Sequence, residues 1–267
     1  MKDSCCLVSI VIPTLNSGKY LASCLQSIRK QTYLNIETII VDSFSTDPTV
    51  KIAEKYNAKT IFCRGIRSEA RNVGVKVSKG EFILCLDSDM QLTPNVINEC
   101  VDSARNGFDA IVIPELSVGE GFWAKCKTLE KLCYNEDDLI EASRFFRRAI
   151  FESIHGYDPE LEAGEDWDLH QRILKFGGHV GRVHSVINHN EGHLSLKTSI
   201  SKKYYYGKTL DRYILKNPDV AKKQLSIFRP AFFRCRRKLA QDPVHAMGLI
   251  IMKTCEYIAA EVGYMLE

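Results

Sequence analysis

Along the first 115 residues of the chain, short apolar runs alternate with segments in which apolar residues recur at every third or fourth position. Short apolar runs suit buried strands, whereas apolar residues at every third or fourth position suit one face of a helix. Strands and helices that alternate in this way are joined by right-handed crossovers and form a mostly parallel central sheet flanked by helices. The sequence therefore predicts an α/β fold, with strands at 8–12, 36–41, 59–63, 81–86 and 110–113 and helices at 21–28, 48–56, 67–77 and after 94.

Two aspartates follow the apolar strand expected at 81–86. Asp87 and Asp89 are separated by one residue, and the amide Gln91 comes two positions later. Alternate side chains of an extended chain point the same way, so these oxygens are expected to converge on one divalent cation. A chain with 15 aspartates should contain about one such pair by chance, so the pair alone is weak evidence. Its position adds weight, because ligands of open α/β sheets bind beyond the carboxyl ends of the strands.

Short polar residues also follow the first two strands. Thr14 and Asn16 come after the first strand, and Asp42 ends the second. Asp42 could accept a hydrogen bond from a nucleotide base or ribose, and Arg71 with Asn72 could donate to a base or phosphate. The alternatives are a helix cap for Asp42 and a surface ion pair for Arg71. No G-x-G-x-x-G follows the first strand and no G-x-x-x-x-G-K-[ST] occurs, which argues against a dinucleotide-binding fold and a P-loop enzyme.

A second acidic segment occupies residues 156–169. Six of its last twelve residues are carboxylates, and Asp166 is expected at the start of a helix that runs to Lys175. A carboxylate in that place either complements the helix dipole or acts as a general base that takes the proton from an attacking hydroxyl. Because Glu165 or Asp168 can cap the helix, the catalytic role is favoured for Asp166.

Two histidines lie four residues apart, His189 and His193, with Glu191 between them. The absence of an H-E-x-x-H pattern and of a nearby cysteine argues against a zinc enzyme. His189 could complete a Mg²⁺ or Mn²⁺ shell, contact a diphosphate, or simply pack against its neighbours.

Composition indicates an ordinary folded protein. The 267 residues are 45% hydrophobic and 26% charged, enough for one large domain or one domain with a helical appendix. The ten cysteines form no C-x-x-C pair and most occur singly among apolar residues, as buried thiols do in a reducing compartment. Residues 1–6 do not resemble a signal peptide, and no apolar run approaches the roughly 18 residues of a membrane span. The sequence therefore predicts a cytoplasmic protein.

The last third of the chain is basic. Between Lys202 and Lys238 there are 12 lysines and arginines against two aspartates, a local charge of +10 that leaves −7 for the rest of a chain of net charge +3. A basic helix is expected at 197–216, basic and aromatic residues alternate at 229–238, and a largely apolar helix is expected at 246–266. Such segments suit peripheral attachment to an anionic membrane at its cytoplasmic face, or helices packed on the main domain with their cations in water. Nucleic acid is the disfavoured partner.

Five segments together resemble the family 2 glycosyltransferases of the GT-A fold, in the family's order over residues 8 to about 190. Each segment alone is unspecific, whereas their combination is specific. They are Val8 to Asn16, Ile39 to Asp47, Arg71 to Gly74, Leu86 to Asp89 and Gly164 to Leu169. The resemblance implies metal-dependent, inverting transfer of a sugar from a nucleotide-diphosphate donor. It also implies a GT-A domain at 1–195, and the charge and apolar pattern of the remainder predicts a helical, basic and amphipathic region at 196–267.

The resemblance further implies roles for particular residues. Asp166 matches the family's catalytic base, and His189 loosely matches a histidine that some members place near the metal and diphosphate. The donor would be bound by Pro13, Thr14, Asn16, Asp42, Arg71, Asp87 and Ser88. A divalent cation, Mg²⁺ or Mn²⁺, would be held by Asp89, Asp87, Gln91 and His189.

Two acceptors stay open at this point. Gln91 is similar to a metal-binding glutamine of dolichyl-phosphate mannose synthases, in which an ionised lipid phosphate attacks and no base is needed. Asp166 instead favours a hydroxyl acceptor that must be deprotonated, on a lipid-linked or cell-envelope glycan. A haloacid-dehalogenase-like phosphatase is disfavoured, since its D-x-D motif usually follows the first strand. A non-catalytic nucleotide-binding or nucleic-acid-binding protein is the remaining alternative, but it does not explain the acidic edge of the sheet.

Overall fold

The computed structural model describes residues 6–226 and 229–266. Residues 1–5 lie outside the described residues. They make up most of the N-terminal segment 1–6 that does not resemble a signal peptide. The chain forms two compact units that alternate along the sequence. Unit 1 comprises Met1–Pro114, Ala142–Pro159 and Asp168–Asn188, and unit 2 comprises Glu115–Glu141, Glu160–Trp167 and His189–Glu267. The division into domains at residue 195 stays a prediction.

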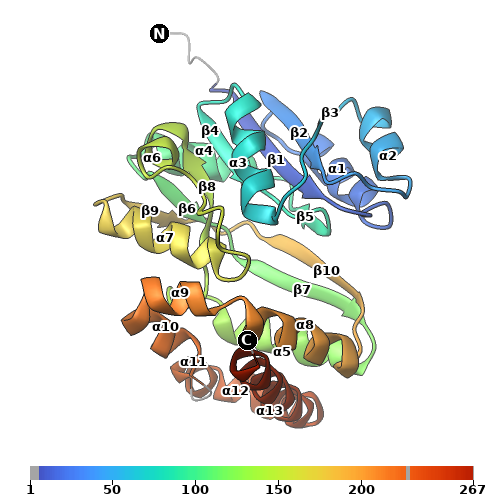
Figure 1. Cartoon of the computed structure of the whole chain (residues 1–267), viewed down its shortest axis with the longest axis vertical. Helices are drawn as coiled ribbons and strands as arrows, with labels where there is room; N and C mark the ends of the chain where they lie inside the picture. Colours follow the sequence, from blue (N-terminus) through green and yellow to red (C-terminus); the bar gives the residue numbers. More distant parts are fainter. Residues whose placement is uncertain (1–5, 227–228, 267) are drawn as a thin grey trace. The chain divides into compact units, whose positions relative to one another are not determined.

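Unit 1 contains a seven-stranded sheet in the order β3-β2-β1-β4-β8-β6-β9 (Figure 1). Neighbouring strands from β3 to β4 are parallel, as are β6 and β9. Strand β8 alone among them is antiparallel, to both β4 and β6. The predicted α/β fold with a mostly parallel sheet is confirmed. The strands are β1 Val8–Thr14, β2 Ile36–Asp42, β3 Lys59–Phe62, β4 Phe82–Cys85, β6 Ala110–Val112, β8 Ser143–Arg147 and β9 Val180–Arg182.

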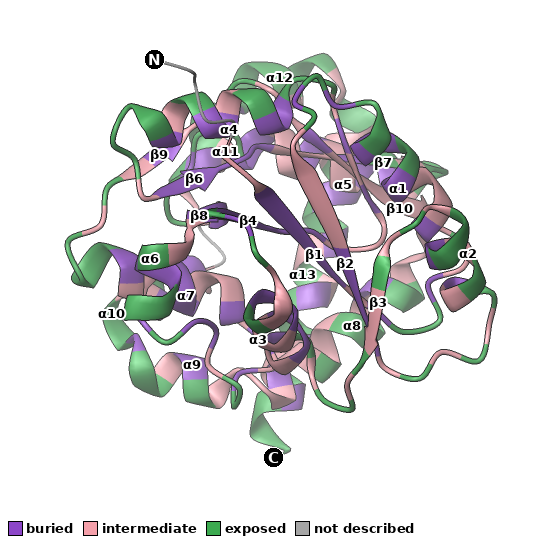
Figure 2. Ribbon diagram, turned by 90° about the horizontal axis from the view of Figure 1, so that it is seen from above, coloured by how far each residue is buried: buried purple, intermediate pink, exposed green. Residues whose placement is uncertain are grey.

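Successive side chains of a strand point to opposite faces of the sheet, so they belong to two different apolar cores. In β1, Ile10 and Ile12 belong to one core and Val11 to the other, and in β4 Leu84 and Ile83 divide in the same way. Helices α1, α2 and α4 supply the first core, and α3, α6 and α7 supply the second. Burial of both faces explains the nearly continuous apolar runs, and Figure 2 shows β1 and β4 buried. These helices are α1 Leu21–Arg29, α2 Thr49–Lys55, α3 Arg67–Val77, α4 Val96–Arg105, α6 Arg148–Ser153 and α7 Glu165–Lys175.

Unit 2 is largely helical. It includes β7 (Glu115–Glu120) and most of β10 (Ile187–His193), which are neighbours in a smaller sheet. Helix α13 packs along α5 and α8, and Leu129 of α5 shares an apolar core with Met252 of α13. No helix in the described part of the chain is long and apolar enough to cross a bilayer. The helices of unit 2 are α5 Phe122–Tyr134, α8 Leu196–Lys208, α9 Asp211–Lys216, α10 Pro218–Gln224, α11 Pro230–Arg234, α12 Arg236–Gln241 and α13 Pro243–Met265.

Some elements differ from the expectation. The predicted helix 197–216 is interrupted, because α8 ends at Lys208 and α9 begins at Asp211, whose carboxylate favours a new helix N-terminus. Strands β5 (Met90–Leu92), β7 and β8 were not predicted. β5 is very short, β7 contains two glutamates and a glycine, and β8 contains two arginines. The cysteines among the described residues are free thiols, and most are buried, as predicted.

Candidate functional site

The carboxyl ends of β1 and β2 are joined through a buried aspartate. The parallel register places Thr14 opposite Asp42, and Thr14 Oγ1 donates to Asp42 Oδ2 at 2.7 Å. Ser45 donates to the same carboxylate through its backbone N, at 2.7 Å, and through its hydroxyl, at 2.6 Å. Asp42 is fully buried, and Pro48 is the N-cap residue of α2. The helix-cap alternative for Asp42 is therefore wrong, and the carboxylate orders the loop that follows β2.

Asn16 connects the loops after the two strands. Its backbone has φ 49°, a left-handed conformation that asparagine tolerates better than most residues. Its N–H donates to Ser45 Oγ at 2.8 Å, and its Oδ1 accepts from the Thr46 N–H at 2.9 Å. Pro13, in β1, lies opposite Val41 of β2. The structure thus brings Thr14, Asn16 and Asp42 together, as predicted.

Helix α3 brings Arg71 against Asp87, the first aspartate after β4. Arg71 Nη2 donates to Asp87 Oδ1 at 2.8 Å, and Arg144 Nη1 of β8 lies 3.5 Å from Asp87 Oδ2. Arg71 is fully buried beneath the ring of Tyr157, at 5.0 Å from the ring centroid, so it is no surface ion pair. Burial alone would raise the pKa of the Asp87 carboxyl, but the charges of Arg71, Arg144 and Arg67 outweigh it and hold that pKa well below its usual range.

The segment after β4 turns, whereas the sequence suggested an extended chain. Strand β4 ends at Cys85, and the Met90 N–H donates to the Asp87 carbonyl at 3.1 Å. Ser88 and Asp89 lie within this turn, and the Ser88 hydroxyl donates to Ser17 Oγ at 2.9 Å. The argument from alternating side chains therefore fails for Asp87 and Asp89. Gln91 follows on β5, where it is partly buried.

The oxygen donors near the end of β4 are few for a divalent ion. Among residues 6–226 and 229–266, no group of three or more His, Cys, Asp or Glu side chains is arranged to hold a metal. Asp89 and Gln91 offer the hard oxygens that Mg²⁺ and Mn²⁺ prefer, while Asp87 is engaged by two arginines. Mg²⁺ commonly takes much of its shell from phosphate and water, so this set fits an ion shared with a diphosphate.

Asp166 belongs to unit 2 and lies in the first turn of α7, which runs to Lys175 as predicted. Gly164 precedes it with φ 77°, and a Cβ on that glycine would lie 2.8 Å from Cγ of Tyr213. Any larger residue would be strained and crowded there. On the other side, Trp167 Nε1 donates to the Ile140 carbonyl at 2.9 Å. Unit 2 therefore fixes the backbone around Asp166 from both sides.

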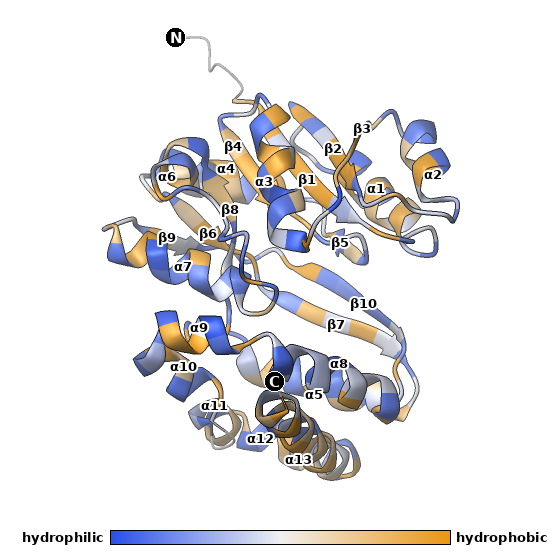
Figure 3. Cartoon of the chain, viewed as in Figure 1, coloured by the Kyte–Doolittle hydropathy of each residue, from blue (hydrophilic) through white to orange (hydrophobic). Residues whose placement is uncertain are grey.

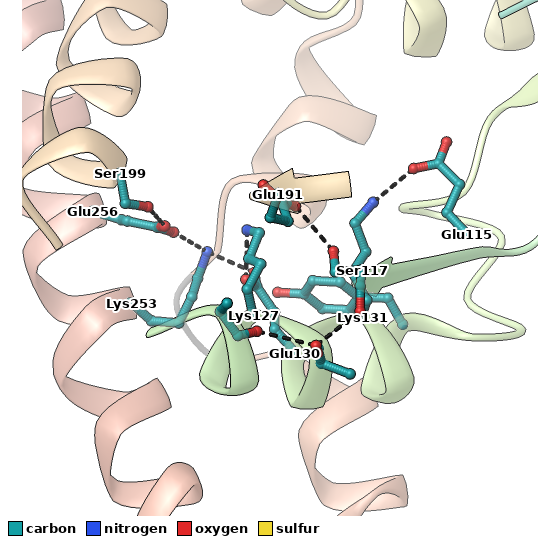
Figure 4. Close-up of polar contacts among 12 residues, drawn as sticks. Glu115, Ser117, Lys127, Glu130, Lys131, Glu191, Ser199, Lys253 and Glu256 are labelled. Carbon is teal, nitrogen blue, oxygen red and sulfur yellow. Dashed lines mark hydrogen bonds and ion pairs between the residues drawn. The ribbon is translucent and has the colours of Figure 1, made fainter. Parts of the chain in front are cut away.

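His189 also belongs to unit 2, on β10. Its Nδ1 lies 3.9 Å from Glu115 Oε2 on β7, and Lys131 Nζ lies 3.0 Å from the same oxygen. Nearby, the Ser117 hydroxyl donates to Glu191 Oε1 at 3.0 Å (Figure 4). Among the described residues of unit 2, His189 thus lies near the carboxylate of Glu115 on β7, which is also contacted by Lys131 of α5. Its role as a metal ligand stays a prediction.

Sequence reasoning missed Ser45 and Arg144. Serine in a loop carries little signal, although Ser45 makes more bonds to Asp42 than Thr14 does. Arg144 lies in a run of basic and aromatic residues, and the two phenylalanines at its centre, Phe145 and Phe146, are fully buried strand residues. That buried pair was the available signal for β8.

Comparisons with known proteins agree on one family. Residues 9–155, more than half of the chain, match the profile of Glycosyl transferase family 2. The glycosyltransferase GlyG of Streptococcus pneumoniae serotype 4 is 41% identical over 114 residues, which are 40% of this chain and 38% of GlyG. The chain therefore spans well under half of that relative's length.

Two solved structures share the fold. The mannosyltransferase PcManGT from Pyrobaculum calidifontis, in complex with GDP-Man and Mn²⁺, matches with a TM-score of 0.64 and 18% identity over 97% of this chain and 86% of that chain. Residues 1–349 of Staphylococcus aureus TarS, in complex with UDP-GlcNAc, match with a TM-score of 0.59 and 18% identity over 97% of this chain and 90% of that chain.

Proposed function

The chain belongs to Glycosyl transferase family 2, and from this we propose that it transfers a sugar, with inversion, from a nucleotide-diphosphate donor to a hydroxyl acceptor. The observation that carries the proposal is the clustering of Thr14, Asn16 and Asp42, with Arg71 on Asp87, at the carboxyl ends of β1, β2 and β4. Ligands of open α/β sheets bind at this edge. GDP-Man in PcManGT and UDP-GlcNAc in TarS support a nucleotide-sugar donor.

In this proposal the donor lies against the loops after β1 and β2. Pro13, Thr14 and Asn16 form the wall for the nucleoside, and the buried Asp42 acts by ordering Ser45 and its loop. Arg71 keeps Asp87 ionised, and Asp87 with Ser88 lies on the diphosphate or ribose side. Rigid, pre-paired polar groups lose little conformational entropy when the donor binds.

Asp89 would hold a divalent cation, with Gln91, Asp87 and His189 as the further candidate ligands. A bound Mg²⁺ or Mn²⁺ supplies a Lewis acid that stabilises the charge on the departing diphosphate. The Mn²⁺ in PcManGT supports this assignment. Asp166 would take the proton from the acceptor hydroxyl as its oxygen attacks the anomeric carbon and the bond to the diphosphate breaks.

The acceptor would be a lipid-linked or cell-envelope glycan. Exposed cations on α12, namely Arg236, Arg237 and Lys238, support a location at an anionic membrane surface, where such acceptors are held. The competing proposal is a polyprenyl-phosphate acceptor, favoured by Gln91. The two acceptors differ in whether a base is needed, because a lipid phosphate is already ionised.

Asp166→Asn separates these alternatives. For a hydroxyl acceptor, we expect donor affinity to stay within about twofold and the transfer rate to fall by about 10²- to 10⁴-fold, the usual contribution of a general base. Released nucleotide diphosphate measures turnover, and calorimetry measures donor binding. Asp219→Asn, an exposed aspartate on α10, is the matched control. Undiminished transfer by Asp166→Asn would reject the base and favour the phosphate acceptor.

A further inference from the structure

Helix α13 carries its central charges on the side that faces the protein. Lys253 Nζ lies 2.9 Å from Glu130 Oε1 of α5 and 2.8 Å from Glu256 Oε2 (Figure 4). The Ser199 hydroxyl of α8 donates to the Glu256 carboxylate. Glu256 is 2% exposed, so this ion-pair cluster is part of the interior of unit 2. The arrangement is the reverse of an ordinary surface helix, whose charges face water.

The opposite side of α13 is exposed and mainly apolar, with the partly buried Glu261 as a charged member, and Figure 3 shows hydrophobic colours along this helix. Its exposed residues recur every three or four positions and form one stripe. Thr254 is a polar member of the stripe, but its hydroxyl donates to the Ile250 carbonyl of the same helix at 2.9 Å. The apolar members include Val244 (65% exposed), Met247 (63%), Ile250 (63%), Ile251 (48%), Ile258 (56%) and Val262 (41%).

Close packing prevents α13 from rotating to bury this stripe. A Cβ on Gly207 of α8 would lie 2.1 Å from the Ala260 carbonyl oxygen, and a Cβ on Gly263 would lie 2.2 Å from the Tyr204 carbonyl oxygen. The two helices therefore touch through their backbones. Together with the buried charge cluster, this contact fixes which side of α13 faces outward.

The stripe continues into a groove between α8 and α13. The groove has a volume of about 510 Å³, and its lining includes Ile200 and Tyr204 from α8 and Ile258 and Val262 from α13. Its walls are almost entirely apolar, so it suits a hydrocarbon chain.

Cations adjoin the stripe at the start of α13. Arg236, Arg237 and Lys238 are exposed on α12, which ends just before α13 begins, and Lys202 is exposed on α8. An apolar stripe next to exposed cations matches an anionic bilayer surface, in which acyl chains lie beneath phosphate groups. A second copy of the chain would instead bring like charges together around the same stripe.

We propose that the outward stripe of α13 inserts into the interfacial layer of an anionic bilayer, with α12 on the lipid phosphates and an acyl chain in the groove. The inference deepens the proposed function, because it identifies the surface that would bring the enzyme to a lipid-linked acceptor. It is tested by binding alone, with no donor present, so its failure would leave the sugar-transfer proposal standing.

The test measures partitioning of the full chain onto vesicles of phosphatidylcholine with phosphatidylglycerol, by co-sedimentation. Replacing Ile251 and Ile258 together, as Ile251→Gln with Ile258→Gln, should weaken partitioning by about 10²-fold, since burial of each side chain is worth roughly tenfold. Leu215→Gln, on α9 and 78% exposed, removes an exposed apolar side chain elsewhere and should leave partitioning unchanged.

A second measurement reports contact with the acyl chains directly. In Ile258→Trp, brominated lipids should quench the fluorescence of the new tryptophan, whereas in Leu215→Trp the additional tryptophan should stay unquenched. Equal partitioning of the double variant and the parent would overturn the proposal. So would a dimer in analytical ultracentrifugation that the double variant dissociates, because the stripe would then be covered by a second copy.

Discussion

Asp87 keeps its charge because three arginines outweigh the cost of burying it. Arg71 is the closest of them and is itself fully buried, so each partner depends on the other for compensation. Removing one member of such a pair leaves an uncompensated charge. The contact between Arg71 and Asp87 therefore contributes both to the stability of the fold and to the proposed donor site.

Arg71→Met is expected to lower the free energy of unfolding by about 3 kcal/mol, the lower end of the cost of breaking a buried ion pair. Arg144→Met should cost less, since Arg144 Nη1 lies 3.5 Å from Asp87 and the contact with Arg71 remains. Urea unfolding measures both variants. A smaller loss for Arg71→Met than for Arg144→Met would contradict the assigned order of the two contacts.

Single residues were predictable where they stand in a motif. Thr14, Asn16 and Asp42 were identified at the sheet edge, and the structure brings them together. Ser45, the partner of Asn16 and Asp42, and the second arginine at Asp87 could not be predicted, because those contacts depend on loop geometry and on the position of β8 in the sheet.

At the scale of elements, α5, α8 and α13 enclose a cluster of charges in which the lysines differ. Glu130 and Glu256 overcome the effect of burial and raise the pKa of Lys253. Lys203 of α8 is in the opposite situation, since burial together with the charges of Lys253 and Lys127 lowers its pKa to about 7.

This lowered pKa makes stability depend on pH. Above about pH 7 the folded chain has released the Lys203 proton while the unfolded chain keeps it to about pH 10, so the unfolded state binds more protons. The contribution of Lys203 to the free energy of unfolding therefore rises with pH between about pH 7 and pH 10. Lys203→Met should remove that contribution, whereas Lys202→Met, its exposed neighbour, should retain it.

Thermal unfolding at several pH values between about 7 and 9 measures this difference. Both variants keep every titrating group other than Lys202 and Lys203, including the buried cysteines. Identical pH slopes in the two variants would show that Lys203 keeps an ordinary pKa in the folded protein.

Elements with a clear apolar pattern were predictable, whereas some short elements and breaks were not. The helix at 67–77 was placed at its observed bounds, because its apolar spacing and neighbouring turns are clear. The β5 strand and the interruption between α8 and α9 lack such signals, and tertiary packing determines them. The apolar helix at the end of the chain was predicted, but the inward direction of its charges followed only from its contacts with α5 and α8.

Across the full chain, sugar transfer at a membrane would require three proposed features: a donor site at the sheet edge, a base on α7 and a membrane surface on α13. The fold class and the family could be predicted from five sequence segments, since their order along the chain is specific. The base and sugar of the donor could not, because they depend on side chains in loops rather than on the motifs.

Isothermal calorimetry with UDP-, GDP- and dTDP-sugars, each with and without Mn²⁺, measures whether the protein binds a nucleotide sugar together with a metal ion. We predict that donors of one nucleotide class bind, that Mn²⁺ strengthens binding at least about tenfold through the shared diphosphate, and that Asp89→Ala abolishes this dependence on Mn²⁺. If none of these nucleotide sugars binds while Mn²⁺ is present and the chain is folded, the proposed sugar transfer is contradicted.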